Sequence, residues 1–388
     1  MTNEVVPPRL SAALLTPIGR GAVATIRVQG DLRELDQSST TVFRAVNGQP
    51  FAQQSIGKIA FGQWGTAQLD AEDVVVCRMG VNLLEIHCHG GDAAVRRILR
   101  DLEQSGCQTL DWHRQLTEVA DTLEAECADA LSRATTWRTA EILLEQTSGL
   151  LRSTFQDLLQ TVTNPDLTSH VISRVRDLLD WSDFGIHLSV PWTVVLTGRP
   201  NVGKSSLINT LLGYQRAIVF DQPGTTRDVV TAETAFDGWP VLLADTAGLR
   251  ETTEELEAAG IALTRQQLKS ADARLVLVDL SQPPMPDDEE LFTLWSSAIV
   301  IGHKCDLGDE WSNRLPADAI RASSVTGENL DEIQRRLVQQ LVPRTPSAGT
   351  PIPISGRQTN HLKQAYIDLT AGNLGAAERV IARLFCER

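Results

Sequence analysis

The sequence predicts a multidomain protein with a small α+β domain at its N-terminus and an α/β domain inserted between helical segments. From about residue 191 to 342, apolar strand-like runs alternate with helical stretches, which is typical of a mostly parallel sheet covered by helices on both faces. Residues from about 114 to 188 instead carry apolar side chains at helical spacing. We therefore expect four segments, at residues 1–112, 113–190, 191–342 and 343–388.

Each expected element follows from its local pattern. Short runs rich in valine and isoleucine between glycines and prolines predict strands, and apolar residues at helical spacing predict helices. The chain is long enough for two or three domains, each with its own core. The expected elements are strands at 22–28, 73–77, 83–87, 193–197, 241–245, 274–279 and 298–302, a helix at 93–102, and one more amphipathic helical stretch from roughly 358 to 386 after a proline-rich linker at 343–353.

Composition excludes several classes of protein. The formal net charge is −14, and the sequence has no basic stripe of the kind that grips a nucleic-acid backbone. Any nucleic-acid contact would therefore be local or made by a partner. No apolar run is long enough to span a membrane, and the first residues do not resemble a signal peptide. Six cysteines without C-x-x-C pairs fit reduced thiols, so we expect a cytoplasmic protein.

The most informative motif is Gly198-Arg-Pro-Asn-Val-Gly-Lys-Ser205, which fits the phosphate-binding loop G-x-x-x-x-G-K-[ST]. It lies between an apolar strand-like run and a helix-like run, as the motif requires. Glycines let backbone N–H groups converge on an anion, and the helix N-terminus adds its positive dipole end. Lys204 would reach the β- and γ-phosphates as a catalytic residue, and the Ser205 hydroxyl would hold Mg²⁺.

Two further motifs follow in the order that a GTP-dependent switch requires. Within Pro223-Gly-Thr-Thr226, Thr226 could place its hydroxyl on Mg²⁺ when a γ-phosphate is present. Asp245-Thr-Ala-Gly248 closes a strand. Asp245 would reach Mg²⁺ through water, and the Gly248 N–H would meet the γ-phosphate.

The last motifs concern the base. His303-Lys-Cys-Asp306 stands where GTPases place Asn-Lys-x-Asp, and Asp306 can accept both N–H donors of guanine, which adenine does not offer. Lys304 would pack its stem over the base. Histidine in place of asparagine predicts weakened, not abolished, selectivity. Ser323-Ser324 matches the final guanine-contacting loop, with serine in place of the commoner alanine. These motifs predict an α/β P-loop GTPase domain.

These motifs and several longer segments resemble the MnmE (TrmE) family of tRNA-modification GTPases. The segments that carry the resemblance are LTPIGRGAVATIRVQG, LEIHCHGG, GRPNVGKSSL, PGTTRD and DTAGLRE. The resemblance implies an N-terminal folate-binding, dimerising domain, and a helical domain made from two chain segments. It also implies a homodimer, K⁺ in the active site, and a flavin-dependent partner, MnmG (GidA). A reduced folate (5-formyl- or methylene-tetrahydrofolate) would be the one-carbon donor, and the partner would carry most of the tRNA contact.

The resemblance assigns roles residue by residue. Asn201 matches the family's K⁺ ligand in the phosphate loop, and Thr225 falls in the loop that encloses the ion together with the backbone of Phe220 and Gln222. Glu257 matches the acid that orients the attacking water. The full set of nucleotide-binding residues is Asn201, Val202, Gly203, Lys204, Ser205, Ser206, Phe220, Asp221, Gln222, Pro223, Gly224, Thr225, Thr226, Asp245, Thr246, Ala247, Gly248, His303, Lys304, Asp306, Ser323 and Ser324.

The residue after Gly248 gives a reason, separate from the resemblance, to expect that an unusual group orients the attacking water. Leu249 follows Gly248, so the glutamine that orients water in Ras-type enzymes is missing. A solvated acidic helix start is the alternative interpretation of Glu257, and Arg250 is the competing catalytic candidate.

In the N-terminal segment, Arg27 and Glu85 match the family's folate-pocket residues, and exposed strand charges are the alternative interpretation. His87 and His89 share a strand face, although no third metal-ligand cluster is evident in the sequence. Val119 sits where the family has a folate-contacting lysine.

Three functions remain open from the sequence. The first is a GTP- and K⁺-dependent component of wobble-uridine (U34) modification in tRNA. The second is a diverged GTPase switch or regulatory factor that has lost the folate-dependent chemistry. The third is a ribosome-assembly GTPase of the Era/Der type, which would predict a basic RNA-binding module that is not visible in the sequence.

Overall fold

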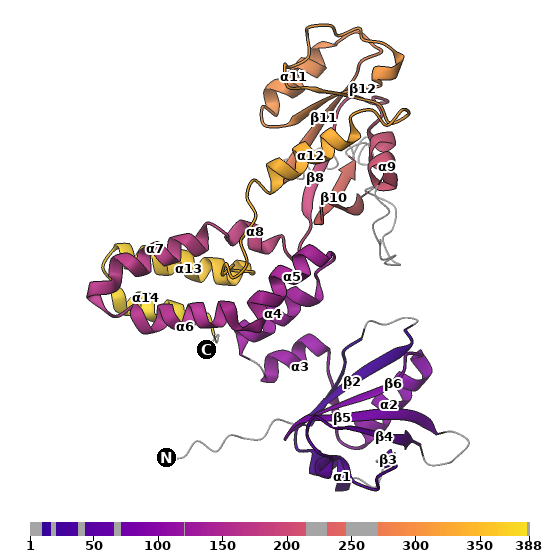
Figure 1. Cartoon of the computed structure of the whole chain (residues 1–388), viewed down its shortest axis with the longest axis vertical. Coiled ribbons are helices and arrows are strands. Elements are labelled where there is room, and N and C mark those ends of the chain that lie inside the picture. The colour runs from indigo at the N-terminus through magenta and orange to yellow at the C-terminus, as the bar shows by residue number, and fades with distance from the viewer. Residues whose placement is uncertain are drawn as a thin grey trace, which may run out of the picture. The chain divides into compact units, whose positions relative to one another are not determined.

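The computed structural model describes residues 10–16, 21–37, 43–65, 71–119, 121–214, 231–245 and 271–385. The chain divides into two compact units, residues 1–125 and 126–388 (Figure 1). Among the described residues, no helix is long and apolar enough to cross a membrane.

The first unit is built on a seven-stranded sheet in the order β3-β4-β5-β6-β2-β1-β7, antiparallel except for the β1–β7 pair. Alternate residues of each long strand point into a core that helix α2 covers with Val95, Ile98 and Leu102. The strands expected at 22–28, 73–77 and 83–87 and the helix at 93–102 are confirmed. The elements are β1 (Ser11–Leu14), β2 (Val23–Gln29), α1 (Leu32–Gln37), β3 (Phe43–Ala45), β4 (Ile59–Trp64), β5 (Glu72–Gly80), β6 (Leu83–His89), α2 (Asp92–Gln104), β7 (Gln108–Thr109) and α3 (Trp112–Val119).

Two of the motifs that carry the family resemblance touch in this unit. The Gly90 N–H donates to the Ala22 carbonyl over 3.1 Å, and a Cβ added to Gly90 would lie 2.1 Å from the Gly21 oxygen. Only glycine therefore fits at position 90 without a backbone shift. The segments LTPIGRGAVATIRVQG and LEIHCHGG are therefore in contact where Ala22 meets Gly90.

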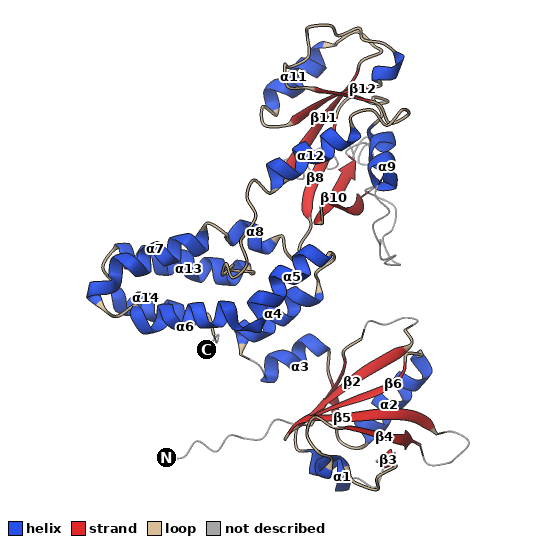
Figure 2. Ribbon diagram, in the orientation of Figure 1, coloured by secondary structure: helices blue, strands red, loops and turns tan. Residues whose placement is uncertain are grey.

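The second unit contains a helical part made from two stretches of the chain. Helix α13 packs against α7 and α14, and α14 packs against α6, so the residues before and after the sheet lie side by side (Figure 2). An ion pair of 2.7 Å between Arg357 and Glu126 joins the same two stretches. The helices are α4 (Thr122–Ser132), α5 (Trp137–Glu145), α6 (Leu151–Thr161), α7 (Thr168–Leu179), α8 (Ser182–Ile186), α13 (Gly356–Thr370) and α14 (Leu374–Ala382).

The structure is helical over most of the amphipathic stretch expected at 358–386, although not as one continuous helix. The chain forms two helices instead, because α13 ends at Thr370 and Gly372 adopts a left-handed φ of +77°. A left-handed glycine just past a helix end satisfies the last carbonyls and turns the chain back. The Gly372 N–H donates to the Leu369 carbonyl at this turn.

The rest of the second unit is a six-stranded sheet in the order β13-β12-β11-β8-β10-β9, parallel except for the β9–β10 pair. The expected mostly parallel sheet and its four predicted strands are confirmed. The strands are nearly continuously apolar because helices cover the sheet (Figure 2). The elements are β8 (Trp192–Thr197), α9 (Lys204–Tyr214), β9 (Thr231–Phe236), β10 (Trp239–Asp245), β11 (Ala273–Asp279), α11 (Pro286–Leu294), β12 (Ile299–His303), β13 (Ile320–Ala322) and α12 (Leu330–Leu341).

The close packing of α8 against the segment before α13 predicts a stability effect. A Cβ added to Gly185 would lie 1.8 Å from the Pro353 oxygen, whereas one added to Gly356 meets nothing within 4 Å. Gly185→Ala is expected to destabilise the helical part by about 1–3 kcal/mol or more, and Gly356→Ala to stabilise it by a few tenths. Urea midpoints of the helical circular-dichroism signal measure both. Equal midpoints for the two variants would contradict the packing.

Candidate nucleotide-binding site

The predicted nucleotide-binding motifs converge at the carboxyl ends of the parallel strands. The phosphate loop leaves the end of β8, and Asp245, Asp279 and His303 are the last residues of β10, β11 and β12. Register pairs Asp279 with His303 across β11 and β12. Ligands of open α/β sheets bind at this edge.

The phosphate loop depends on left-handed backbone positions. Gly198, Asn201 and Gly203 have φ values of 147°, 65° and 101°. A Cβ at Gly198 would lie 2.3 Å from the Leu277 carbonyl oxygen, and one at Gly203 would lie 2.4 Å from the His303 ring. Both glycines are therefore required for backbone geometry and for space.

The side chains expected to bind the phosphates and Mg²⁺ lie close to the phosphate loop. The Lys204 side chain is 5% exposed, and its ammonium donates to the carbonyls of Gly198 and Arg199 over 3.0 Å each. The Ser205 hydroxyl donates to Asp245 over 2.6 Å. A hydroxyl and a carboxylate in contact are the oxygen donors that Mg²⁺ takes, so these residues fit that ion. The buried ammonium fits the phosphates of a nucleotide.

Lys304 and Asp279 tie the base side to the phosphate loop. Lys304 adopts a left-handed φ of 61°, and its ammonium donates to the Asn201 carbonyl over 2.9 Å and to Asp279 over 2.6 Å. Burial alone would raise the pKa of Asp279, but hydrogen bonds from Lys304 and Ser281 hold it below its usual value. Asp279 was not among the residues predicted from the sequence. Its place at the end of a buried strand was the available signal.

His303 lies between two loops. It is 3% exposed, with Nδ1 lying 2.8 Å from the Val202 carbonyl oxygen and Nε2 lying 2.8 Å from the Ser324 hydroxyl. Because a carbonyl only accepts, Nδ1 carries the hydrogen, and Nε2 of the neutral ring accepts from Ser324. Burial lowers the pKa of His303, while the hydrogen bond to Val202 opposes that shift.

The remaining base-side residues differ in exposure. Ser323 is fully buried, and its hydroxyl accepts from the backbone N–H groups of Val325 and Thr326, which shapes the loop. Asp306 lies on the turn Cys305–Leu307 and is exposed. In the described part of the chain no group hydrogen-bonds its carboxylate, so both oxygens can accept from a guanine edge.

Arg199 connects the phosphate loop to helix α11. Its guanidinium lies 3.4 Å from Asp288, which is 2% exposed. Asp288 also accepts from the Met285 N–H at the helix start. No local sequence signal pointed to this contact, because the two residues are far apart in the chain.

Several predicted site residues lie outside the described residues, so the roles assigned to them stay predictions. These are Phe220, Asp221, Gln222, Pro223, Gly224, Thr225, Thr226, Thr246, Ala247, Gly248, Leu249, Arg250 and Glu257.

In the first unit, Arg27 and Glu85 are register partners on β2 and β6 and form an ion pair of 3.0 Å. His87 hydrogen-bonds Thr25 over 3.0 Å, and His89 pairs with Glu72. Within the described ranges, no group of three or more His, Cys, Asp or Glu side chains gathers in a way that could hold a metal ion.

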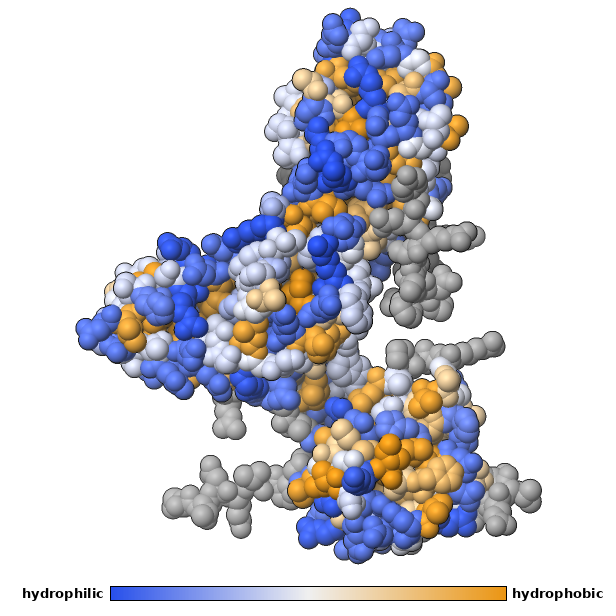
Figure 3. Space-filling view, viewed as in Figure 1, coloured by the Kyte–Doolittle hydropathy of each residue, from blue (hydrophilic) through white to orange (hydrophobic). Residues whose placement is uncertain are grey.

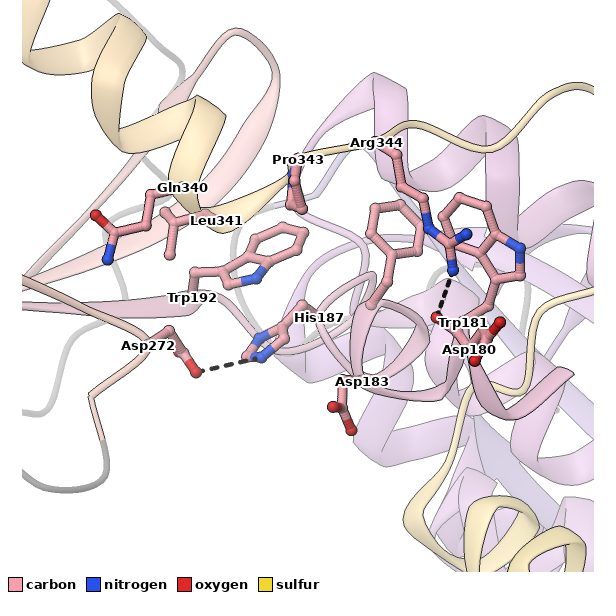
Figure 4. A pocket seen from close by; sticks show the side chains of 11 residues that line it. Asp180, Trp181, Asp183, His187, Trp192, Asp272, Gln340, Leu341, Pro343 and Arg344 are labelled. Carbon is pink, nitrogen blue, oxygen red and sulfur yellow. Dashed lines mark hydrogen bonds and ion pairs between the residues drawn. The ribbon is translucent and has the colours of Figure 1, made fainter. Parts of the chain in front are cut away.

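A cavity of about 290 Å³ lies at the opposite edge of the sheet, where β8 begins (Figure 4). The His187 ring stacks on Trp192 with centroids 4.7 Å apart and approaches Asp272 to 3.5 Å. Arg344 lies 4.1 Å from the ring centre of Trp181. These contacts join α8 and the chain after α12 to the sheet, away from the phosphate loop.

Comparison with known proteins agrees with this geometry. Residues 193–304 match the family model described as "50S ribosome-binding GTPase". "tRNA modification GTPase MnmE" of Lactococcus lactis subsp. cremoris is 31% identical over 84% of this chain and 80% of its own length. The protein of that name from Synechococcus sp. is 32% identical over 96% of this chain and 88% of its own.

Solved structures match a smaller part of the chain. Era of Aquifex aeolicus bound to GDP and AlF₄⁻ is 27% identical, with a TM-score of 0.31, over 40% of this chain and 58% of its own. The G domain of the T. maritima FeoB iron transporter is 27% identical, with a TM-score of 0.29, over 38% of this chain and 98% of its own.

The fold and the site define a P-loop enzyme that binds GTP and hydrolyses it. The matches that extend along most of the chain are more specific. The chain belongs to the tRNA modification GTPase MnmE family, and it is a GTPase involved in tRNA modification.

The buried His303 predicts a pH effect. Because its folded pKa lies below the ordinary value, the unfolded chain binds a proton first as pH falls below about 6.5. Its contribution to stability is therefore complete above that pH and is lost below it. In an NMR titration of the histidine ring protons, the midpoint of His303 should lie below the ordinary value, and its signal should be absent in His303→Asn. A His303 midpoint at or above 6.5 would contradict this placement.

Proposed function

We propose that this protein is the GTP-hydrolysing, K⁺-dependent component of wobble-uridine modification in tRNA. The observation that carries the proposal is the intact phosphate side of the site. A buried Lys204 and a Ser205–Asp245 contact lie beside a phosphate loop whose Gly198, Asn201 and Gly203 all have positive φ. The MnmE relatives match far beyond this domain. By contrast, a GTPase of the Era/Der type would predict a basic RNA-binding module, and the sequence shows no basic stripe.

Mg²⁺ and K⁺ would be held by oxygen donors around this loop. Ser205 and Thr226 would hold Mg²⁺, with Asp245 reaching it through water. Asn201 would offer its amide oxygen to K⁺, with Thr225 and the backbone of Phe220 and Gln222. Asn201 suits this role because its side chain is exposed while its carbonyl is engaged by Lys304. When bound, these cations neutralise charge on the transferring phosphoryl group.

The residues of the chain would do the remaining work of hydrolysis. Lys204 would leave the carbonyls of its own loop and donate to the β- and γ-phosphates. Glu257 would orient the attacking water, since Leu249 occupies the position after Gly248. Asp306 and the loop of Ser323 and Ser324 would hold the guanine.

Homodimerisation would use the first unit. The sheet face opposite α2 carries apolar side chains, with Ile59 75% exposed, Phe61 49% and Val23 56%. Figure 3 shows apolar surface over this unit. An exposed apolar sheet face of this kind is typical of an interface. We propose that a second copy covers it.

A reduced folate would bind near Arg27 and Glu85. Arg27 Nε is buried and has no hydrogen-bond partner among the residues that the structure describes, which leaves one donor for a ligand. The flavoprotein MnmG (GidA) would supply the redox chemistry and most of the tRNA contact, in agreement with the acidic chain.

A diverged switch without folate chemistry is the second candidate. It is favoured by Val119, which stands where the resemblance expects a folate-contacting lysine. Strand register alone places Arg27 opposite Glu85, so their ion pair has a structural explanation that does not involve folate.

The K⁺ assignment predicts a cation-dependent rate. GTP hydrolysis should be roughly 100-fold faster in KCl than in NaCl, the effect of one charge-stabilising group. Asn201→Gly should abolish this difference while GDP affinity stays close to that of the wild type. Glycine keeps the left-handed φ of 65° without strain, so the variant removes only the side chain. Equal rates of GTP hydrolysis in the two salts would contradict the assignment of Asn201 as a K⁺ ligand.

The modification role predicts a chemical phenotype. Deleting the gene should remove the modified wobble uridine from tRNA, as measured by mass spectrometry of tRNA nucleosides. The wild-type gene should restore it, and Lys204→Ala should not, because the phosphate contact is lost. Unchanged modification in the deletion strain would sink the proposal and favour the diverged switch.

A further inference from the structure

His303 and Ser324 both depart from the usual residues of the guanine-binding motifs, which are asparagine at the first position and alanine at the second. The two departures meet in the structure. His303 Nε2 lies 2.8 Å from the Ser324 hydroxyl oxygen, although 21 residues separate them in the chain. The unusual residue at position 303 is therefore hydrogen-bonded to the unusual residue at position 324.

We propose that His303 and Ser324 form a matched pair, the His303–Ser324 clasp, which holds the phosphate loop against the base-side loop and sets nucleotide affinity without selecting the base. This inference rests on GTP binding. It does not depend on the proposed K⁺ site or on the modification chemistry.

Geometry gives the clasp its two ends. His303 Nδ1 donates to the Val202 carbonyl in the phosphate loop, and Nε2 accepts from Ser324 in the loop after β13. Nε2 lies further from the backbone than either amide atom of asparagine. An asparagine at this position would leave the Ser324 hydroxyl without this partner. An alanine at position 324 would leave Nε2 without a donor. The hydrogen bond therefore requires both the histidine at position 303 and the serine at position 324.

Packing fixes the ring in place. The ring lies so close to Gly203 that a Cβ there would approach it to 2.4 Å. The next residue, Lys304, holds the Asn201 carbonyl. Residues 303 and 304 thus hold successive carbonyls of the phosphate loop, and the clasp links that pair of contacts to the loop of Ser323 and Ser324.

The same contacts remove His303 from base recognition. A neutral imidazole has one donor and one acceptor, and both are engaged inside the protein. The exposed Asp306 carboxylate keeps both oxygens for a guanine edge. His303 is therefore a positioning residue, and Asp306 carries the side-chain discrimination between guanine and adenine.

A double-mutant cycle on the full chain tests the clasp, with affinity for a fluorescent GDP analogue as the measurement. Ser324→Ala and His303→Asn should each weaken binding about 5- to 50-fold, because each leaves one partner unsatisfied. The double variant should bind at least about fivefold more tightly than the product of the single effects predicts. Competition by ADP should remain within about threefold of wild type in each variant and improve sharply in Asp306→Ala.

Two controls separate the clasp from general damage. Ser347→Ala removes an exposed hydroxyl in the linker and should leave affinity unchanged. Ser324→Thr keeps a hydroxyl and should bind more tightly than Ser324→Ala. If His303→Asn fails to fold, the Ser324 variants still test the proposal. A wild-type affinity for the GDP analogue in Ser324→Ala would overturn it. Independent single effects would also overturn it, as would a roughly tenfold gain in ADP competition for His303→Asn.

Discussion

The turn from strand β8 into helix α9 is the constraint on which the rest of the site depends. The loop reverses over the end of the sheet with three left-handed residues, and Gly198 lies against the carbonyl of Leu277 in the neighbouring strand. That contact fixes the loop to β11. Because β11 is also in register with β12, the same contact fixes the distance from the loop to His303 and Lys304. Any side chain at Gly198 or Gly203 would separate parts that the nucleotide must bridge.

Polar groups then fill positions that the sheet has already set. Asp245, Asp279 and His303 each end a buried parallel strand, so their side chains meet at one edge without any loop having to place them. Ser205 and Lys204 reach this edge from the first turn of α9, where the positive end of the helix dipole points. A rigid sheet edge is therefore the reason that short motifs, separated by many residues, act as one site.

Much of this was predictable from the sequence, and the failures have a common physical cause. Strand positions followed from apolar runs, and the phosphate loop and Asp306 followed from motifs whose spacing is local. The break between α13 and α14 was missed because the apolar spacing continues across Gly372, and only the left-handed backbone there reveals it. The contacts of Asp279 with Lys304, of Asp288 with Arg199 and of His303 with Ser324 depend on strand order. In the sequence, His303 and Ser324 are two separate departures from the usual motif residues, and only the fold brings them into contact.

The nucleotide site and the Arg27–Glu85 pair differ in how much free energy their local conformations cost. Asn201 and Lys304 hold left-handed backbone at a cost of roughly 1–2 kcal/mol each, and Lys204 is kept almost fully buried. At Lys304 this conformation is held by the hydrogen bonds of its ammonium to Asn201 and Asp279, both at the nucleotide site. Arg27 and Glu85 are different, because strand register alone places them opposite each other, and a cross-strand ion pair is stable without a ligand. Among the residues that the structure describes, Arg27 Nε is buried without a hydrogen-bond partner, and this is the feature of the pair that strand register does not explain.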